Sequence, residues 1–310
     1  MLIETRKIRG VIAPVVTPFN NDLSPDTERF VAHCRWLISQ NCGLAIFGTN
    51  SEGNSLSVDE KLELLDHLVA AGVDTARMMP GTGCCAIPDT VRLTEHSVKA
   101  GAAGVLMLPP FYYKGVSEDG LYRSFSEVIH RVGEEHLRVY LYHIPQVSGV
   151  GIPLKLIERL LRDYPATIAG IKDSSGDWSY TEQLLSAFKG TDFDVFVGSE
   201  SFLLKNMQSG GAGCISATAN VNPAAIEKLY LNWDRAEAAS TQKDLDETRQ
   251  IVGQHGMIPA LKAVIAHFSG QPEWRNVRPP LDRLIDEHAT DLISQLEVRG
   301  FTMPGIRDLG

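Results

Sequence analysis

The sequence predicts an α/β fold, a (β/α)8 (TIM) barrel with about three additional C-terminal helices. Three observations carry this prediction: eight short apolar runs, amphipathic segments between them, and the end of such runs after Pro223. The runs are continuous and flanked by Gly or Pro, as is typical of strands that a parallel sheet buries on both faces. Eight alternating units favour a closed barrel. The alternative is an open, doubly wound sheet, but its usual GxGxxG fingerprint is missing after the first run.

The eight apolar runs are the expected strands of the barrel. In chain order they begin near Val11 (VIAPVV), Leu44 (LAIFG), Met78 (MMPGTG), Gly104 (GVLMLPP), Val139 (VYLYHIP), Ile168 (IAGIK), Phe193 (FDVFVG) and Gly213 (GCISAT).

Helix-like segments separate these runs. They are residues 25–40, 58–71, 88–100, 118–132, 153–163, 179–188 and 200–209. The first segment places Phe30, Cys34, Leu37 and Ile38 on one apolar stripe, and the second places Leu62, Leu65 and Val69 on another. Ser57 is the expected N-cap of the second helix, because Glu60 follows at capping-box spacing.

The C-terminal quarter reads as helices alone. Segments 224–233, 236–253, 259–268 and 281–298 show no strand-like run between them. The first is the expected eighth barrel helix. The others should pack on the barrel or on a neighbouring subunit, so we divide the chain into a (β/α)8 barrel at 1–232 and a C-terminal helical extension at 233–310. The last ten residues, FTMPGIRDLG, are expected to form a loose tail.

Composition excludes several classes of partner. The chain has 29 Lys and Arg against 38 Asp and Glu, a net charge of −9 that disfavours nucleic acid and anionic lipid. No apolar run approaches the ~20 residues of a membrane span, and no signal-peptide core follows residues 1–10, so we expect a cytoplasmic protein. The five cysteines lack CxxC spacing and no HxxxH accompanies them, which predicts buried reduced thiols and no metal site.

Chemistry in such a barrel is expected at the C-terminal ends of the strands. Lys172 follows the buried run IAGI, so its amine should point into the barrel mouth. A desolvated lysine has a lowered pKa and supplies a free amine for Schiff-base chemistry. The alternative is a lysine paired with a carboxylate such as Asp173 or Glu200. Tyr142 ends the preceding strand, where it either moves protons beside that amine or is a core ring with a solvated hydroxyl.

Two further loops carry candidate groups. The turn Thr49-Asn50-Ser51 offers backbone N–H groups to an anion such as a carboxylate, or is an ordinary βα turn. Tyr112 and Tyr113 follow Pro109-Pro110 on a loop that reaches either the site or an interface. Strand alternation sends His143 to the face opposite Tyr142, which favours a structural role.

Four ordered motifs resemble a known family. GTNSEG, PPFYYKG, YLYHIP followed by GIKDSSG, and GCISATAN are similar to motifs of the dihydrodipicolinate synthase / N-acetylneuraminate lyase family, and the resemblance covers nearly the whole chain. It implies (β/α)8 enzymes, usually homotetramers built as dimers of dimers. Such enzymes join a lysine to pyruvate or another 2-oxo acid as a Schiff base, with no metal or organic cofactor.

The resemblance also implies roles for single residues. Lys172 looks like the Schiff-base lysine, Tyr142 like the proton-transferring tyrosine, and Thr49 like the hydroxyl of a proton relay. The backbone of Thr49 and Asn50 matches the groups that hold the 2-oxo carboxylate. Tyr112 or Tyr113 matches a tyrosine lent to the neighbouring subunit's site, and Gly198 and Ile215 match residues that line the pocket.

Two positions at which this sequence differs from the family pattern help to choose among the activities found in the family. Asn50-Ser51 stands where Thr-Gly is common, and Val147 stands where synthases that form dihydrodipicolinate carry an arginine. Valine cannot pair with a substrate carboxylate, so the segment looks more like the lyase and sugar-acid aldolase branches. Val147, Ser174, Glu200 and Ala217 are expected to shape the end of the pocket that takes the aldehyde half.

The predicted function is therefore a class I lyase that cleaves a hydroxylated 2-oxo acid to pyruvate and an aldehyde. Alternatives are a dehydratase or deaminase using the same imine, and a 4-hydroxy-tetrahydrodipicolinate synthase, which Val147 disfavours. An acid-binding protein without turnover has only Asn50-Ser51 in its support. A phosphate-binding isomerase is disfavoured by Glu200, whose charge would repel phosphate.

Overall fold

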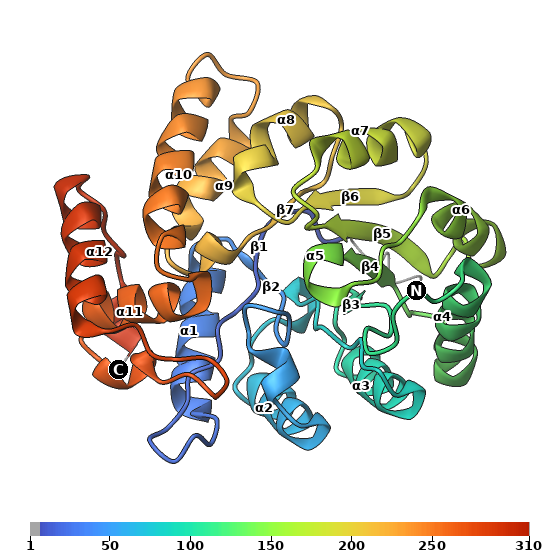
Figure 1. Ribbon diagram of the computed structural model, residues 1–310, viewed down its shortest axis with the longest axis horizontal. Coiled ribbons are helices and arrows are strands. Elements are labelled where there is room, and N and C mark those ends of the chain that lie inside the picture. The colour runs from blue at the N-terminus through green and yellow to red at the C-terminus, as the bar shows by residue number, and fades with distance from the viewer. Residues whose placement is uncertain (1–6, 310) are drawn as a thin grey trace.

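Parallel strands form a curled sheet at the centre of the protein (Figure 1). The structure is a computed structural model that describes residues 7–309. The order of its seven strands is β2-β1-β7-β6-β5-β4-β3, and every pair is parallel. The strands are β1 (Gly10–Ala13), β2 (Gly43–Leu44), β3 (Val105–Met107), β4 (Val139–His143), β5 (Ile168–Asp173), β6 (Asp194–Val197) and β7 (Gly213–Ile215).

The segment 78–82 closes this sheet into a barrel. It bridges β2 at Met78 and β3 at Gly81, both in parallel sense. The N–H of Met79 donates to the Leu44 carbonyl at 2.8 Å on one side, and the Leu106 N–H donates to the Pro80 carbonyl at 2.8 Å on the other. Proline has no N–H for a regular ladder, which explains why this run is not a continuous strand. All eight apolar runs therefore take part in the barrel, and the predicted fold class is confirmed.

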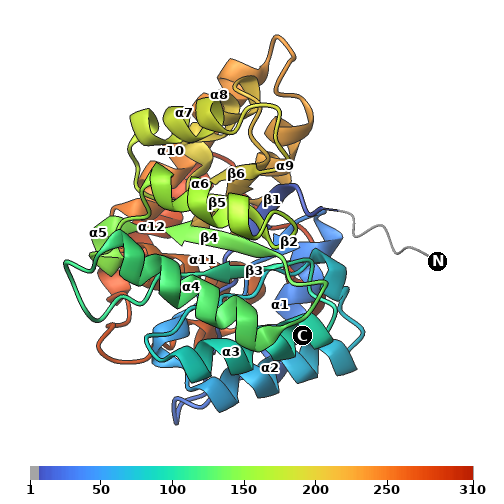
Figure 2. The ribbon, with the colours of Figure 1, turned by 90° about the vertical axis from the view of Figure 1, so that its right-hand side faces the viewer.

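Helices surround the barrel on its outside (Figures 1 and 2). They are α1 (Thr27–Ser39), α2 (Val58–Ala70), α3 (Ile87–Lys99), α4 (Glu118–Val132), α6 (Leu154–Asp163), α7 (Trp178–Ala187), α8 (Leu203–Gln208) and α9 (Pro223–Leu231). The short helix α5 (Pro145–Ser148) follows β4 directly and lies over the strands in Figure 1. Short 3₁₀ turns lie at Gly53–Ser55, Thr75–Arg77, Glu200–Phe202 and Ala217–Asn220. The sequence did not indicate α5, and the segment predicted as one helix at 200–209 is a 3₁₀ turn followed by α8.

Local predictions for the first two helices had different outcomes. The capping box at Ser57 is confirmed, since Glu60 N–H donates to its Oγ at 3.1 Å and its own N–H donates to Glu60 Oε2 at 2.8 Å. The apolar stripe of α1 is buried at Phe30, Cys34 and Leu37. The stripe assigned to α2 was wrong at Val69, which is 43% exposed, whereas Leu65 is buried as predicted and Leu62 is half-buried. Leu64 and Leu68 are the other buried leucines of this helix. A leucine-rich helix offers several stripes, and packing against its neighbours selects one of them.

The interior of the barrel is filled by alternate side chains of its strands. Residues of this inner cluster include Ile12, Met79, Leu106, Tyr140, Tyr142, Phe196 and Ile215. The intervening residues of β4, Val139 and Leu141, belong to a separate cluster with helices α4 and α6. This alternation directs the Tyr142 side chain inward, and its partner in the register of β5 is Lys172.

Three further helices follow the barrel, as predicted, and pack against one another, with α10 also against α9 (Figure 1). They are α10 (Ala238–Gly253), α11 (Met257–Ser269) and α12 (Asp286–Val298), with 3₁₀ turns at Pro272–Arg275 and Ile306–Leu309. Leu245, Leu261 and Leu292 from these helices share one buried cluster with barrel residues. The boundary between a barrel at 1–232 and an extension at 233–310 stays a prediction.

The loose tail predicted at the C-terminus was wrong for the residues described. Met303 and Ile306 are buried, and the Trp36 indole N–H donates to the Pro304 carbonyl at 2.9 Å. The burial of Met303 and Ile306 and the hydrogen bond from Trp36 hold this segment against α1. Such tertiary contacts cannot be predicted from the composition of the segment.

The cysteine prediction holds for three of the five residues. Cys34, Cys42 and Cys214 are buried, but Cys84 is only partly buried and Cys85 is exposed, because both lie in the loop between segment 78–82 and α3. Within residues 7–309, no helix is both long and apolar enough to cross a membrane. The same part of the chain holds no group of three His, Cys, Asp or Glu side chains arranged for a metal ion.

Candidate active site

Lys172 lies near the C-terminal end of β5 and is buried inside the barrel, with 2% of its surface exposed. Its Nζ lies 4.2 Å from the centroid of the Tyr142 ring. Within residues 7–309, no carboxylate oxygen lies within 4.0 Å of this amine. The face of an aromatic ring attracts a cation but leaves the nitrogen free to react once it is deprotonated.

The two carboxylates that offered an alternative partner for Lys172 are bound elsewhere. Asp173 accepts hydrogen bonds from the Ser175 N–H at 3.0 Å and from the Thr181 hydroxyl at 2.5 Å. Glu200 forms an ion pair with Arg249 at 2.8 Å. The amine of Lys172 therefore stands apart from both.

Tyr142 and Thr49 form a hydroxyl pair beside this lysine. The distance between Tyr142 Oη and Thr49 Oγ1 is 3.1 Å, and either atom can donate. Tyr142 comes from β4 and is buried, whereas Thr49 comes from the loop after β2 and is half-buried. A pair of hydroxyls in contact can pass a proton, and one end of this pair belongs to the ring that contacts the lysine.

The turn that carries Thr49 contains hydrogen bonds of its own. The Gly48 carbonyl accepts from the Ser51 N–H at 3.1 Å and from the Gly53 N–H at 3.0 Å. A Cβ at Gly53 would lie 2.1 Å from the Phe47 carbonyl oxygen, so only glycine fits there. Within the described chain, the N–H groups of Thr49 and Asn50 have no hydrogen-bond partner. Two adjacent free N–H groups can bind an anion.

The other predicted pocket residues lie on loops that follow the strands at the same end of the barrel. Ser174 and Gly198 are half-buried and in close contact, since a Cβ at Gly198 would lie 2.1 Å from the Ser174 Oγ. Ile215 and Ala217 are buried at the end of β7. Val147 lies on α5 and is 61% exposed.

Glu200 begins the 3₁₀ turn after β6, and its buried carboxylate has several hydrogen-bond partners. It accepts hydrogen bonds from the Ser216 and Thr218 hydroxyls and from Arg249. Sequence reasoning did not anticipate these contacts, because Arg249 lies on α10, 49 residues further along the chain. The arrangement ties the loops after β6 and β7 to the C-terminal helices.

Tyr112 and Tyr113 lie apart from the lysine, on the loop between β3 and α4. Each is 73% exposed, and their rings pack edge-on against each other at 5.2 Å. His143 packs away from the site: its Nδ1 accepts from the Ile152 N–H at 3.0 Å, its ring stacks on Tyr180, and burial lowers the pKa of His143. The structure thus brings Lys172, Tyr142 and Thr49 together and leaves the two tyrosines on the surface.

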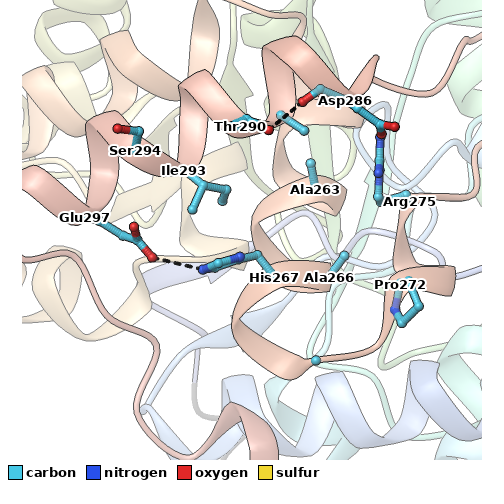
Figure 3. A pocket seen from close by; sticks show the side chains of 12 residues that line it. Ala263, Ala266, His267, Pro272, Arg275, Asp286, Thr290, Ile293, Ser294 and Glu297 are labelled. Carbon is cyan, nitrogen blue, oxygen red and sulfur yellow. Dashed lines mark hydrogen bonds and ion pairs between the residues drawn. The ribbon is translucent and has the colours of Figure 1, made fainter.

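A hollow of about 740 Å³ lies elsewhere, between α11, α12 and the turn Pro272–Arg275 (Figure 3). Its charged side chains pair with one another, His267 with Glu297 at 3.1 Å and Arg275 with Asp286 at 2.7 Å. It contains none of the predicted site residues. This hollow is therefore separate from the predicted site at the barrel mouth.

A closed parallel barrel with polar side chains gathered at the C-terminal ends of its strands is the architecture of TIM-barrel enzymes. The comparison with known families agrees with this class. The chain belongs to the Dihydrodipicolinate synthetase family, whose sequence pattern matches residues 7–298. The family resemblance seen in the sequence is thereby confirmed.

Sequence relatives and proteins of solved structure match this chain over almost its full length. An uncharacterized DapA-like lyase of Chloroflexus aurantiacus is 32% identical, over 93% of this chain and 96% of that protein. YagE, an Escherichia coli K12 prophage protein of the dihydrodipicolinic acid synthase family solved with pyruvate, has a TM-score of 0.86 and 27% identity, over 95% of this chain and 99% of that one. A 2-keto-3-deoxygluconate aldolase variant of Sulfolobus solfataricus has a TM-score of 0.83 and 26% identity, over 94% and 96% of the two chains.

Proposed function

We propose that this protein is a class I lyase that forms a Schiff base between Lys172 and a 2-oxo acid. It reversibly cleaves a hydroxylated 2-oxo acid to pyruvate and an aldehyde. The observation that carries the proposal is the buried Lys172 amine, free of carboxylates, on the ring of a tyrosine whose hydroxyl contacts Thr49. The pyruvate complex of YagE and the aldolase from Sulfolobus solfataricus support it from related chains.

The reaction begins when the lone pair of Lys172 Nζ attacks the ketone carbon. The carbinolamine loses water to give an imine, and Tyr142 and Thr49 carry the protons that this step moves. Tyr142 then takes the proton of the substrate's 4-hydroxyl as the C3–C4 bond breaks. The electron pair of that bond passes into the protonated imine, which becomes the enamine of pyruvate. Since the imine is the electron sink, the reaction requires no metal or organic cofactor.

The free N–H groups of Thr49 and Asn50 are the proposed binding site for the 2-oxo carboxylate. The aldehyde half is proposed to lie at the end of the pocket shaped by Val147, Ser174, Glu200 and Ala217, and Gly198 and Ile215 are proposed to line the rest of the pocket. Valine at 147 offers no positive charge to a second carboxylate. The proposal therefore favours neutral hydroxylated aldehydes over the carboxylate-bearing aldehyde that a 4-hydroxy-tetrahydrodipicolinate synthase condenses.

We further propose a cytoplasmic homotetramer in which Tyr112 or Tyr113 of one subunit completes the site of its neighbour. The support is their exposure: two adjacent aromatic rings, each 73% exposed, are unusual on a surface that stays in water.

Borohydride trapping with pyruvate, followed by peptide mass mapping, tests the proposed function. We expect an adduct on Lys172 that is absent in Lys172→Ala and retained in Lys155→Ala, a matched exposed lysine. An adduct with longer 2-oxo acids but not with pyruvate would favour the dehydratase or deaminase alternatives. A folded protein that forms no adduct with any 2-oxo acid would refute the proposal.

A further inference from the structure

A buried ion pair joins the C-terminal helices to the turn that carries Thr49. Lys262 of α11 and Glu52 of the turn bond to each other, and both side chains are fully buried. The second Glu52 oxygen accepts from the Arg278 N–H at 2.9 Å, and Lys262 Nζ also donates to the Asn276 carbonyl at 2.7 Å. Each charge therefore has more than one partner, as a buried pair requires.

Glu52 is the residue through which this pair reaches the turn. Its N–H donates to the Thr49 carbonyl at 3.1 Å, so its backbone orients the peptide unit that begins at Thr49. Its φ of +54° lies in the left-handed region, which residues other than glycine adopt only where the surroundings fix them. The bonds from Lys262 and Arg278 hold the Glu52 side chain while its backbone has this conformation.

The surroundings of Lys262 leave it no other anionic partner within the described chain. Its Nζ lies 4.5 Å from the centroid of the Phe19 ring, and the Arg278 guanidinium lies 4.7 Å from the same ring. Arg278 itself is paired with Glu60. Burial lowers the pKa of Lys262 to about 8, and the charge of Glu52 opposes that shift. The pair is therefore mutually dependent: either charge alone would be buried without compensation.

We propose that Lys262 is a positioning residue of the active site. Acting through Glu52, it fixes the Thr49–Asn50 turn so that both free N–H groups point at the carboxylate of the 2-oxo acid. This inference rests on the proposed function. It predicts that Lys262 contributes to recognition of the carboxylate and not to the reactivity of the Lys172 amine.

The test compares pyruvate with pyruvamide, which has the same ketone but no carboxylate. Borohydride trapping gives the half-saturating concentration of each compound for the wild type, Lys262→Met and Glu52→Gln. Leu160→Ala is the matched control, because it removes a fully buried side chain from α6, outside the site. Circular dichroism establishes that each variant is folded, and Glu52→Gln, which keeps the shape of the side chain, serves if Lys262→Met does not fold.

We expect the preference for pyruvate over pyruvamide to fall about tenfold in Lys262→Met and Glu52→Gln, the size of one hydrogen bond to a charged group. The preference of the Leu160→Ala control should stay near the wild-type value. An unchanged preference in both variants, or an equal loss in Leu160→Ala, would overturn the inference while leaving the proposed function intact. A wild type that is never trapped would overturn both.

Discussion

The hydroxyl pair of Tyr142 and Thr49 gives a prediction that separates a proton relay from two independent groups. Tyr142→Phe keeps the ring against which Lys172 Nζ lies at 4.2 Å but removes the hydroxyl. Thr49→Val removes the other hydroxyl with little change in shape, and Thr49→Ser keeps it. The double variant Tyr142→Phe with Thr49→Val completes a cycle in which the coupling between the two hydroxyls is measured directly.

The magnitudes follow from the role of each group. Loss of a positioned general acid–base group slows a proton transfer by about 10² to 10⁴-fold, which we expect for Tyr142→Phe. The 3.1 Å hydrogen bond is worth about 0.5–1.5 kcal/mol, or about two- to tenfold in rate, which we expect for Thr49→Val. Because Thr49 acts through Tyr142, the double variant should be no slower than Tyr142→Phe alone.

The assay is the rate at which the pyruvate imine forms, followed by borohydride quenching at timed intervals and intact-mass measurement. Denaturant unfolding of each variant shows whether stability has changed. If the two losses multiply in the double variant, or if Thr49→Ser is as slow as Thr49→Val, the relay is wrong and the two hydroxyls act separately.

Two further predictions concern groups outside the reaction. Burial lowers the pKa of His33 to about 4 from 6.5, so the unfolded chain binds a proton between these values that the folded chain does not. The free energy of unfolding should fall as the pH drops through this window, by about 3 kcal/mol at 1.36 kcal/mol per pKa unit. His33→Gln should lose less stability over the same range in denaturant titrations, and an identical loss would contradict the assignment. Among the five thiols, Cys85 should react first with iodoacetamide in the native protein because it alone is exposed. Peptide mapping that finds Cys34, Cys42 or Cys214 alkylated at the same rate would contradict the burial described.

The sequence predicts those parts of the fold that depend on neighbouring residues of one segment, such as the strands of the barrel. Burial on both faces requires a continuous apolar run, and all eight runs lie in the barrel. The run at Met78 shows the limit, because Pro80 lacks the N–H that a regular ladder needs. Lys172 and Tyr142 could be placed side by side because neighbouring strands of a parallel barrel end at the same edge.

Long-range contacts were beyond prediction for an equally physical reason. Glu52 and Lys262 are 210 residues apart, and no spacing pattern marks them as partners. The same holds for Arg249 with Glu200, and for the C-terminal segment that packs on Trp36. Each of these contacts depends on how whole helices and loops pack against one another. The hydrophobic periodicity of a single segment carries no information about that packing.

The Glu52–Lys262 pair also has a consequence for how the chain acquires its final form. Ribosomes deliver the chain from its N-terminus, so Glu52 emerges long before Lys262 and Arg278, which follow it by 210 and 226 residues. Contacts with such separation form late, after the entropy of closing a long loop has been overcome. The strands can assemble earlier, but the turn near the start of the chain acquires its final conformation only when α11 docks. Nascent chains released before that point would present a barrel in which the turn at Thr49 and Asn50 has not yet reached its final conformation.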